Sequence, residues 1–267
     1  MGTDNNIQDI HRLVVCSDLR KNILHSLNEG NKSLGNLRDE LNISSTTAIH
    51  ALRELEKSDI TFQDKHKKYS LTNIGKIIVL KLLEFSDAAQ VLKKHDRFWL
   101  DHDISGIPKD QMEKIGWLKD SNLVVINPLD IIKTHESYVA FIQNAKWIKG
   151  VSPIYSTDYE KIFQEVIKNN ISIELVLTDA VFNKLTNTMG LDNFNNLIRN
   201  HPIDVFLTDE NVRVAFTITD AFFSFGLFTN NNVYDIAHDL ISTDDLAIRW
   251  GIELFEYYRG RARKHGT

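Results

Sequence analysis

The sequence predicts a mixed α/β protein, of the α+β kind, in which a small helical part precedes a long helix and a larger part with a sheet. Three observations predict it. Residues 33–71 read as two short helices and a hairpin, residues 73–99 carry one long apolar stripe, and beyond Gly106 and Pro108 short apolar runs alternate with helical patterns. We therefore expect three parts, over residues 1–75, 76–103 and 104–267.

The first part contains a helix-turn-helix pattern. The apolar positions of its three predicted helices are Leu19, Ile23, Leu24 and Leu27; Leu34, Leu37 and Leu41; and Ala48, Ala51, Leu52 and Leu55. Ser17 can cap the first helix, which ends near Gly30, and Ser44 or Ser45 can cap the third. Residues 42–44 interrupt the apolar period and predict the turn. A hairpin follows, with strands near residues 60–63 and 69–71.

The outward face of the third helix is polar. It carries Ser45, Thr46, Ile49, His50 and Arg53. Short hydroxyls near a helix N-terminus and an arginine farther along suit the major groove of DNA, and the isoleucine can contact a thymine methyl group. The hairpin tip adds Lys65, His66, Lys67 and Lys68, which can meet backbone phosphates. The pattern predicts a winged helix-turn-helix that binds double-stranded DNA. The alternative is a generic packing module with a solvated turn.

Composition neither supports nor excludes a nucleic-acid partner. The formal net charge is −5, and residues 1–75 hold ten Lys or Arg against ten Asp or Glu. Any affinity for DNA must therefore come from local placement. The one cysteine, Cys16, has no partner for a disulfide or a metal-ligand pair and reads as a small buried hydrophobe. The sequence has only this one cysteine, no long apolar run and no signal peptide. Together these observations predict a cytoplasmic protein.

A long helix over residues 76–103 links the two domains. Its apolar residues alternate spacings of four and three, at Ile78, Leu82, Phe85, Ala89 and Leu92, and Trp99 resumes the phase. This short heptad seam predicts a homodimer. The alternative is a helix docked on its own domain. His95 and His102 lie seven residues apart and are interpreted as a solvated helix end; no metal is expected.

The third part alternates strands and helices before it becomes a meander. Strands are expected near residues 123–126, 147–151, 171–177, 205–207, 213–219 and 222–228, and helices near 130–144, 158–169, 179–188 and 192–200. This order predicts a mixed, largely parallel sheet. Ser242 is expected to open the last helix, with Ala247, Trp250, Leu254 and Tyr258 facing inward. Its basic end, RGRARK, is interpreted as a favourable helix C-terminus rather than a DNA-binding arm.

No catalytic motif accompanies this sheet. The sequence has no P-loop, GxGxxG, GxSxG or HExxH, so we expect neither an enzyme nor a cofactor. An enzyme whose reactive groups meet only on folding stays the alternative. A small-molecule effector is expected at the carboxyl ends of two strands, where Ser152, Tyr155, Thr178 and Asp179 lie. The alternative is that these residues cap and cover neighbouring elements.

Both halves resemble known regulators. ISSTTAIHALRELE and YSLTNIGK resemble the winged helix of archaeal ArsR-like regulators, and the blocks from HDISGIPKDQMEKIG to DLISTDDLAIRWGIELFEYYR are similar to the FilR1-type regulatory domain of methanogens. The resemblance implies an archaeal transcriptional regulator, dimeric, with an effector-sensing C-terminal domain. The sheet pattern is also similar to the phospholipase-D-like fold. The HxKxxxxD of active members is missing, which implies a degenerate catalytic domain that only binds.

Overall fold

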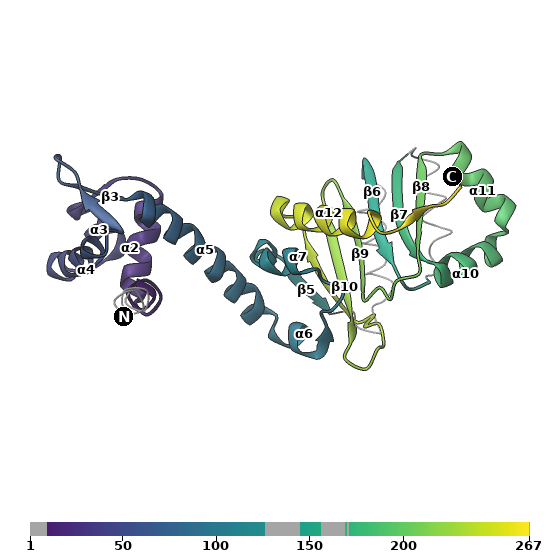
Figure 1. Ribbon diagram of the computed structural model, residues 1–267, viewed down its shortest axis with the longest axis horizontal. Helices are drawn as coiled ribbons and strands as arrows, with labels where there is room; N and C mark the ends of the chain where they lie inside the picture. The colour runs from purple at the N-terminus through teal and green to yellow at the C-terminus, as the bar shows by residue number, and fades with distance from the viewer. Residues whose placement is uncertain (1–9, 126–144, 156–168, 170, 267) are drawn as a thin grey trace, which may run out of the picture. The chain divides into compact units, whose positions relative to one another are not determined.

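The computed structural model describes residues 10–125, 145–155, 169 and 171–266 (Figure 1). The chain divides into two compact units, residues 1–86 and 87–267. The helix expected at 130–144 and nearly all of the one expected at 158–169 lie outside the described residues. None of the helices in the described ranges is both long and apolar enough to cross a membrane.

Unit 1 has the predicted order of helices and hairpin. Its elements are α2 (Asp18–Asn28), β1 (Lys32–Ser33), α3 (Leu34–Leu41), α4 (Ser45–Lys57), β2 (Thr61–Gln63), β3 (Lys68–Leu71) and the first half of α5 (Asn73–Lys94). The three strands form an antiparallel sheet in the order β1-β3-β2. Short β1, which the sequence pattern did not indicate, pairs through Lys32 with Tyr69 and widens the wing sheet.

The predicted caps of unit 1 are confirmed. The Ser17 hydroxyl accepts from the Arg20 N–H at 3.4 Å, and Gly30 follows α2 with a φ of 149°. Such a φ disfavours any side chain, which explains glycine there. The inward positions of the three helices form one core, in which Ile23, Leu24 and Leu52 are fully buried. This core fixes which face of each helix is left outside.

The long helix is shorter than expected. Thr72 caps α5 by accepting from the Gly75 N–H at 3.0 Å. The helix then ends at Lys94, and α6 (Asp96–Asp101) begins after a break at His95. The His95 ring contacts the Ser121 carbonyl at 3.1 Å, a tertiary contact that accompanies the non-helical backbone. The spacing suggests a seam that continues in one helix to Trp99, but the structure divides it between two helices.

Unit 2 is built on a sheet that has nine strands within the described residues. After α6 come β4 (His102–Asp103), α7 (Lys109–Glu113), the 3-10 turn η1 (Ile115–Leu118), β5 (Asn122–Val125), β6 (Trp147–Ser152), β7 (Ser172–Thr178), α10 (Asp179–Met189), α11 (Leu191–Asn200), β8 (Ile203–Thr208), β9 (Val214–Thr219), β10 (Phe223–Thr229), β11 (His238–Ser242), α12 (Asp245–Arg259) and β12 (Arg263–Lys264). The strand order is β12-β8-β7-β6-β9-β10-β11-β5, with β4 beside β10.

The sheet is mixed, as predicted, but the prediction that most of its strands are parallel is wrong. Among the strands that the structure describes, only β6 with β7 and β7 with β8 pair in parallel. The pairs β6–β9, β9–β10, β10–β11 and β11–β5 are antiparallel. Two helices, α10 and α11, carry the chain from β7 back to the start of β8, whereas β9, β10 and β11 follow one another through turns without a helix, and such a turn reverses the strand.

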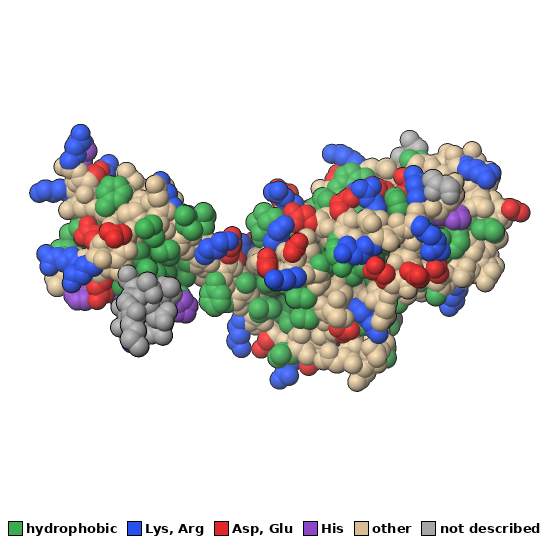
Figure 2. All heavy atoms as spheres, in the orientation of Figure 1, with side chains coloured by type: hydrophobic (Ala, Val, Ile, Leu, Met, Phe, Trp, Pro, Cys, Tyr) green, Lys and Arg blue, Asp and Glu red, His purple; other side chains and the backbone are tan. Residues whose placement is uncertain are grey.

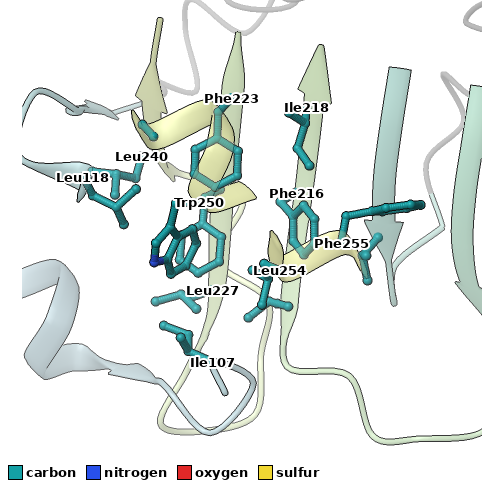
Figure 3. Close-up of a cluster of buried hydrophobic side chains, with 14 of the residues drawn as sticks. Ile107, Leu118, Phe216, Ile218, Phe223, Leu227, Leu240, Trp250, Leu254 and Phe255 are labelled. Atoms are coloured by element: carbon teal, nitrogen blue, oxygen red, sulfur yellow. The ribbon is translucent and has the colours of Figure 1, made fainter. Parts of the chain in front are cut away.

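Helices cover both faces of the sheet. On one face α12 packs over β6, β9 and β10, and Trp250, its largest fully buried side chain, lies beside Phe223 (Figure 3). The Trp250 ring also contacts that of Phe225. On the other face α10 and α11 cover β7 and β8, where alternate residues such as Ile173 and Leu177 face a second core. The sheet is thus a rigid frame with two cores.

The last helix begins later than predicted. Residues 238–242 form β11, so Ser242 ends a strand, and Asp244 is the N-cap that accepts from Leu246 and Ala247 N–H groups. The inward residues of α12 are confirmed as buried. Of the basic stretch RGRARK, only Arg259 belongs to α12, so its interpretation as a helix C-terminus is wrong for Arg263 and Lys264, which form β12 beside β8. There Arg263 meets Asp179 at 2.5 Å and Lys264 meets Asp204 at 2.7 Å.

Candidate nucleic-acid interface

Helix α4 is set by a sharp turn after α3. Asn42 takes a left-handed conformation with φ 52°, which asparagine tolerates well, and Ser44 caps α4 by accepting from the Thr47 N–H at 3.1 Å. The four apolar positions of α4 are all buried. Because they face inward, the opposite side of α4 must face outward.

The structure places the predicted reading residues together on that outward side. Ser45, Thr46, His50 and Arg53 are exposed, and Ile49 is half-buried among them. The Thr47 hydroxyl is engaged with Ser44 at 2.7 Å and is therefore part of the cap. The arrangement gives one continuous polar strip, with hydroxyls at the helix N-terminus and a guanidinium two turns later.

A carboxylate beside this strip is neutralised by a neighbouring helix. Glu54 of α4 forms an ion pair with Arg20 of α2 at 2.7 Å, and the His50 ring lies 3.9 Å from its other oxygen. Arg20 also donates to the Leu13 carbonyl at 2.5 Å. Sequence reasoning missed Arg20, because the pair joins residues 34 positions apart. The pair offsets the negative charge of Glu54, which would otherwise repel a phosphate.

The hairpin tip is shaped by one acidic side chain. The Asp64 carboxylate accepts from the His66 and Lys68 N–H groups at 2.8 and 2.9 Å, and Lys67 takes a φ of 59°. This local network closes the turn with backbone atoms and leaves the basic side chains outside.

Figure 2 shows the resulting cluster of basic side chains at the end of the β2–β3 hairpin. Lys65, His66, Lys67 and Lys68 are all exposed. In the described part of the chain no ion pair involves these three lysines. Their charge is therefore available to an anionic partner, at the position where a wing meets backbone phosphates.

The predicted seam on the long helix is divided. Leu82 is only 8% exposed and Ile78 is half-buried, and both pack on the core of unit 1. Phe85, at 63% exposed, and Leu92, at 44%, face outward, as does Ala89. Two further isoleucines of α5, Ile74 and Ile77, are exposed by more than half.

The predicted effector residues lie at one edge of the sheet. Strands β6 and β7 are parallel neighbours, with Ser152 beside Leu177, so their carboxyl ends meet. Each side chain has a local role: Ser152 donates to the Ile154 carbonyl, Thr178 caps α10, and Asp179 pairs with Arg263.

Tyr155 completes this group of effector residues. Its hydroxyl lies 3.4 Å from that of Thr188, and the Lys184 ammonium lies 4.7 Å from its ring centre. In this structure, then, these residues cap or cover neighbouring elements, as the alternative states. Ser152, Tyr155, Thr178 and Asp179 nevertheless all lie at the same edge of the sheet.

The interpretation of His95 and His102 as a solvated helix end is wrong. They are 8% and 7% exposed. The His95 ring contacts the Ser121 carbonyl, and the His102 ring contacts the Phe98 carbonyl. Among the described residues, no group of three or more His, Cys, Asp or Glu side chains could hold a metal ion.

His102 belongs to a polar cluster that no sequence pattern indicated. Its Nε2 lies 3.0 Å from Asp235 Oδ2, and His238 Nδ1 lies 2.7 Å from the same oxygen. Burial opposes the ionisation of Asp235, but hydrogen bonds from the Ala237 N–H and the two histidines outweigh it and hold its pKa below the usual value. Residues 133 positions apart meet here, so only the fold could reveal the cluster.

A second carboxylate, Asp239, lies next to this cluster. Burial raises the pKa of Asp239 to about 6, against the effect of the Ser224 hydroxyl, which donates at 2.5 Å, and with help from the charge of Asp235. The pKa values of Asp239 and Asp235 are therefore shifted in opposite directions.

Two family models match the chain, in two separate stretches. The N-terminal domain of methanogenesis regulatory protein FilR1 matches residues 8–89, and the middle domain of the same protein matches residues 131–261. Only residues 1–7, 90–130 and 262–267 are left unmatched. Both halves of the chain thus match the FilR1 family.

A curated FilR1 agrees with these matches. Methanogenesis regulatory protein FilR1 of Methanothrix harundinacea (strain 6Ac) is 28% identical over 257 residues, which cover 95% of this chain and 57% of the relative. The chain thus spans little more than half the length of that FilR1.

Among solved structures, the archaeal chromatin protein TrmBL2 covers 98% of this chain and 99% of its own, at 14% identity and a TM-score of 0.41. Phosphatidylserine synthase of Haemophilus influenzae Rd KW20 covers 54% and 39%, at 13% identity and a TM-score of 0.38. At these scores neither likeness carries an argument about the function of this chain.

Proposed function

We propose that this protein is a transcriptional regulator of the FilR1 type, which binds duplex DNA through α4 and the β2–β3 wing. The observation that carries the proposal is the exposed polar strip of α4, opposite its buried stripe and accompanied by a wing tip whose lysines have no ion pair in the described chain. The matches to FilR1 over both halves support it. Helix α4 enters the major groove, and the wing lysines contact phosphates.

The domain roles follow from this proposal. Residues 1–75 bind DNA as an ArsR-like winged helix, residues 76–103 link and dimerise, and residues 104–267 sense a signal. Such a regulator acts in the cytoplasm of an archaeal cell, where the DNA lies.

The test is a binding titration, in which the protein is added to labelled DNA from upstream of its own gene. Binding is measured by fluorescence anisotropy at several salt concentrations. Arg53→Ala should cost about 1–3 kcal/mol on the best sequence and relax the preference at one base pair, because Arg53 would bond a base edge. Lys67→Ala should weaken all sequences alike and lower the salt slope by about 1, because Lys67 would contact a phosphate.

Lys109→Ala is the matched control. It removes the same charge from an exposed site of unit 2, where Lys109 meets Glu113 only at 3.8 Å, and should change neither affinity nor slope. Absence of any salt-sensitive complex at low salt would refute the DNA-binding function.

We further propose that the protein is a homodimer joined along the exposed side of α5. Phe85, Ala89 and Leu92 of the predicted seam supply this side, extended by Ile74 and Ile77. Several large apolar side chains that are exposed together on one helix are typical of a surface that binds another protein. Two DNA-binding units in a dimer match the two half-sites of a palindromic operator.

An effector is proposed at the carboxyl ends of β6 and β7. Tyr155 supplies an aromatic wall, and Ser152, Thr178 and Asp179 supply hydroxyls and a carboxylate for a polar small molecule. A thermal-shift screen of polar metabolites tests it. Compounds that raise the Tm of the wild type should have no effect on Tyr155→Ala/Asp179→Ala.

Asp204→Ala is the control for this screen, because it breaks a comparable surface ion pair, Asp204 with Lys264. A compound that shifts the double variant as much as the wild type would place the effector elsewhere. The second candidate function is an enzyme or a degenerate phospholipase-D-like domain that uses the winged helix as an adaptor.

A further inference from the structure

A buried histidine in unit 2 is held between two acceptors. His102 begins β4, directly after α6, and its ring is enclosed by the fold. Its Nδ1 lies 2.7 Å from the Phe98 carbonyl oxygen, and its Nε2 lies 3.0 Å from Asp235 Oδ2. Both distances are those of hydrogen bonds.

These two contacts require more protons than a neutral imidazole and a carboxylate possess. A neutral imidazole has one N–H and one lone pair, and a carbonyl oxygen only accepts, so the N–H belongs at Nδ1. The lone pair of Nε2 would then face an oxygen of Asp235. The contact becomes a hydrogen bond only when one further proton lies between His102 and Asp235, on either atom.

The other partners of Asp235 do not supply that proton to Nε2. Its Oδ1 accepts from the Ala237 N–H at 2.9 Å, and its Oδ2 is shared with His238 Nδ1 at 2.7 Å. Two imidazoles thus converge on one oxygen of Asp235, which can only accept from them as long as Asp235 is ionised. We call His102, Asp235 and His238 the His102 cluster.

The charges around the cluster favour a bound proton. Asp239, on β11, adds a second carboxylate, which the Ser224 hydroxyl contacts. Asp103, on β4, has its nearest cation in Arg213 at 3.9 Å, and the Asp103 carboxylate also accepts from the Ser105 N–H. Asp235 and Asp239 thus place two carboxylates at the cluster, and their negative charge favours a bound proton against the opposing effect of burial.

The cluster joins two segments that are far apart in the sequence. Strand β4 pairs with the end of β10, His102 opposite Thr229, and the Asn230 amide donates to the Leu100 carbonyl at 3.1 Å. Only two residues of β4 pair in this way. So short a ladder adds little by itself, so the polar contacts of this segment with β10 and β11 are the two hydrogen bonds of Asn230, to the Leu100 and Asp101 carbonyls, and the His102 cluster.

We propose that the His102 cluster is a proton-dependent latch: one bound proton fastens the α6–β4 segment to the β10–β11 connection, and loss of that proton in alkaline solution releases it. The inference stands apart from the proposed DNA binding, because every residue in it belongs to unit 2. It assigns to this unit a sensitivity to protons that acts on the segment directly following α5.

The first test is nitrogen-15 NMR of the histidine side chains in the full chain from pH 5.5 to 9. At pH 7 the nitrogens of His102 should show the shifts of a proton-rich cluster, with a transition at higher pH than that of N-acetylhistidine methylamide in the same buffer. A wild-type His102 that titrates with or below this reference would overturn the proposal.

Asp235→Asn provides the decisive variant. An amide can accept from Ala237 with its oxygen and donate from its nitrogen to the lone pair of a neutral His102, so the extra proton is no longer needed. The variant should fold, and its His102 transition should move to lower pH than in the wild type. An unchanged transition would show that Asp235 does not hold the proton.

Hydrogen exchange tests the mechanical part. After correction for intrinsic rates, the amides of residues 102–103 should exchange about tenfold faster or more above the transition than below it in the wild type. The pH dependence should vanish in Asp235→Asn. His95→Gln, at a buried histidine with one carbonyl contact, should keep it. Equal protection of these amides on both sides of the transition would refute release.

Discussion

Among the described glycines of unit 1, Gly75 lies closest to another stretch of backbone. A Cβ built on this residue, in the first turn of α5, would lie 2.0 Å from the carbonyl oxygen of Ile60. Neither backbone can give way easily, because Thr72 binds Ile60 as well, its N–H donating to the Ile60 carbonyl at 3.0 Å. We predict that Gly75→Ala lowers the free energy of unfolding of unit 1 by about 1–3 kcal/mol, measured by urea denaturation.

Gly35→Ala is the matched control for that substitution. Gly35 is also near the start of a helix, α3, but its Cβ would meet only the Ser33 hydroxyl, at 3.7 Å. Alanine favours a helix over glycine by about 0.5–1 kcal/mol, so this change should leave unit 1 as stable or make it more stable. Equal losses from both substitutions would contradict the steric argument.

Asp239 gives a pH dependence with a definite sign. Its pKa is about 6 in the folded protein and near 3.8 when the carboxyl is free in water, so the folded state binds the proton more tightly. Its contribution to stability is fully present below pH 3.8 and is lost as the pH rises through 6. Relative to Asp239→Asn, the wild type should therefore lose on the order of 2 kcal/mol between pH 4 and pH 7.

The measurement is urea unfolding of both proteins at several pH values. The variant amide can still accept from Ser224, so the comparison isolates the ionisation. Asp235 has the opposite sign, because its pKa is lowered, and its contribution is lost only as the pH falls below its ordinary range. If the two stability curves run parallel from pH 4 to pH 7, Asp239 is not protonated in the folded state.

Among elements, the amphipathic helices were the most predictable. The buried stripes of α4 and α12 could be read directly from the sequence, because each needs only its own spacing of apolar residues. The two-residue strands β1, β4 and β12 could not, since two residues carry no period. Strand β11 was missed for another reason: HDLIS mixes charges with two apolar residues, and it is a strand because β10 and β5 lie on either side.

The end of α5 was equally hidden from the sequence. Its apolar spacing continues past His95, but the helix breaks there, where the ring of His95 contacts the carbonyl of Ser121, 26 positions away. For the same reason the seam could be predicted only in part. Which apolar residues of α5 face the core depends on how the helix lies against unit 1, and Val79, outside the predicted seam, is fully buried.

The exposed side of α5 yields a prediction about assembly. Phe85→Asp/Leu92→Asp places two charges where apolar side chains would pack in a dimer, so the variant should be a monomer at micromolar concentration in analytical ultracentrifugation. Its Tm should show no loss beyond that due to dissociation, because both side chains are exposed. Leu191→Asp, at a residue 51% exposed on α11, should leave the sedimentation coefficient unchanged. A monomeric wild type would remove the proposed dimer.

At the scale of the whole molecule, the sequence could predict local sites better than assembled ones. The strip on α4 and the wing tip each lie within a short stretch, so their residue types and order were sufficient. Contacts such as Arg20 with Glu54 and His102 with Asp235 join distant positions. Each depends on the packing of several elements, and no spacing rule in one sequence encodes that.

The two units have separate cores, and this has a measurable consequence. Leu52 is fully buried in the core of unit 1, and Trp250 is fully buried in that of unit 2. Trp250→Ala should destabilise unit 2 by about 3–5 kcal/mol through the cavity and the lost hydrogen bond to the Gln111 carbonyl. Leu52→Ala should cost unit 1 about 2–5 kcal/mol. Because the cores share no residue, each change should lower one calorimetric transition and leave the other in place. A single transition that shifts as a whole with either substitution would show instead that the two units unfold together.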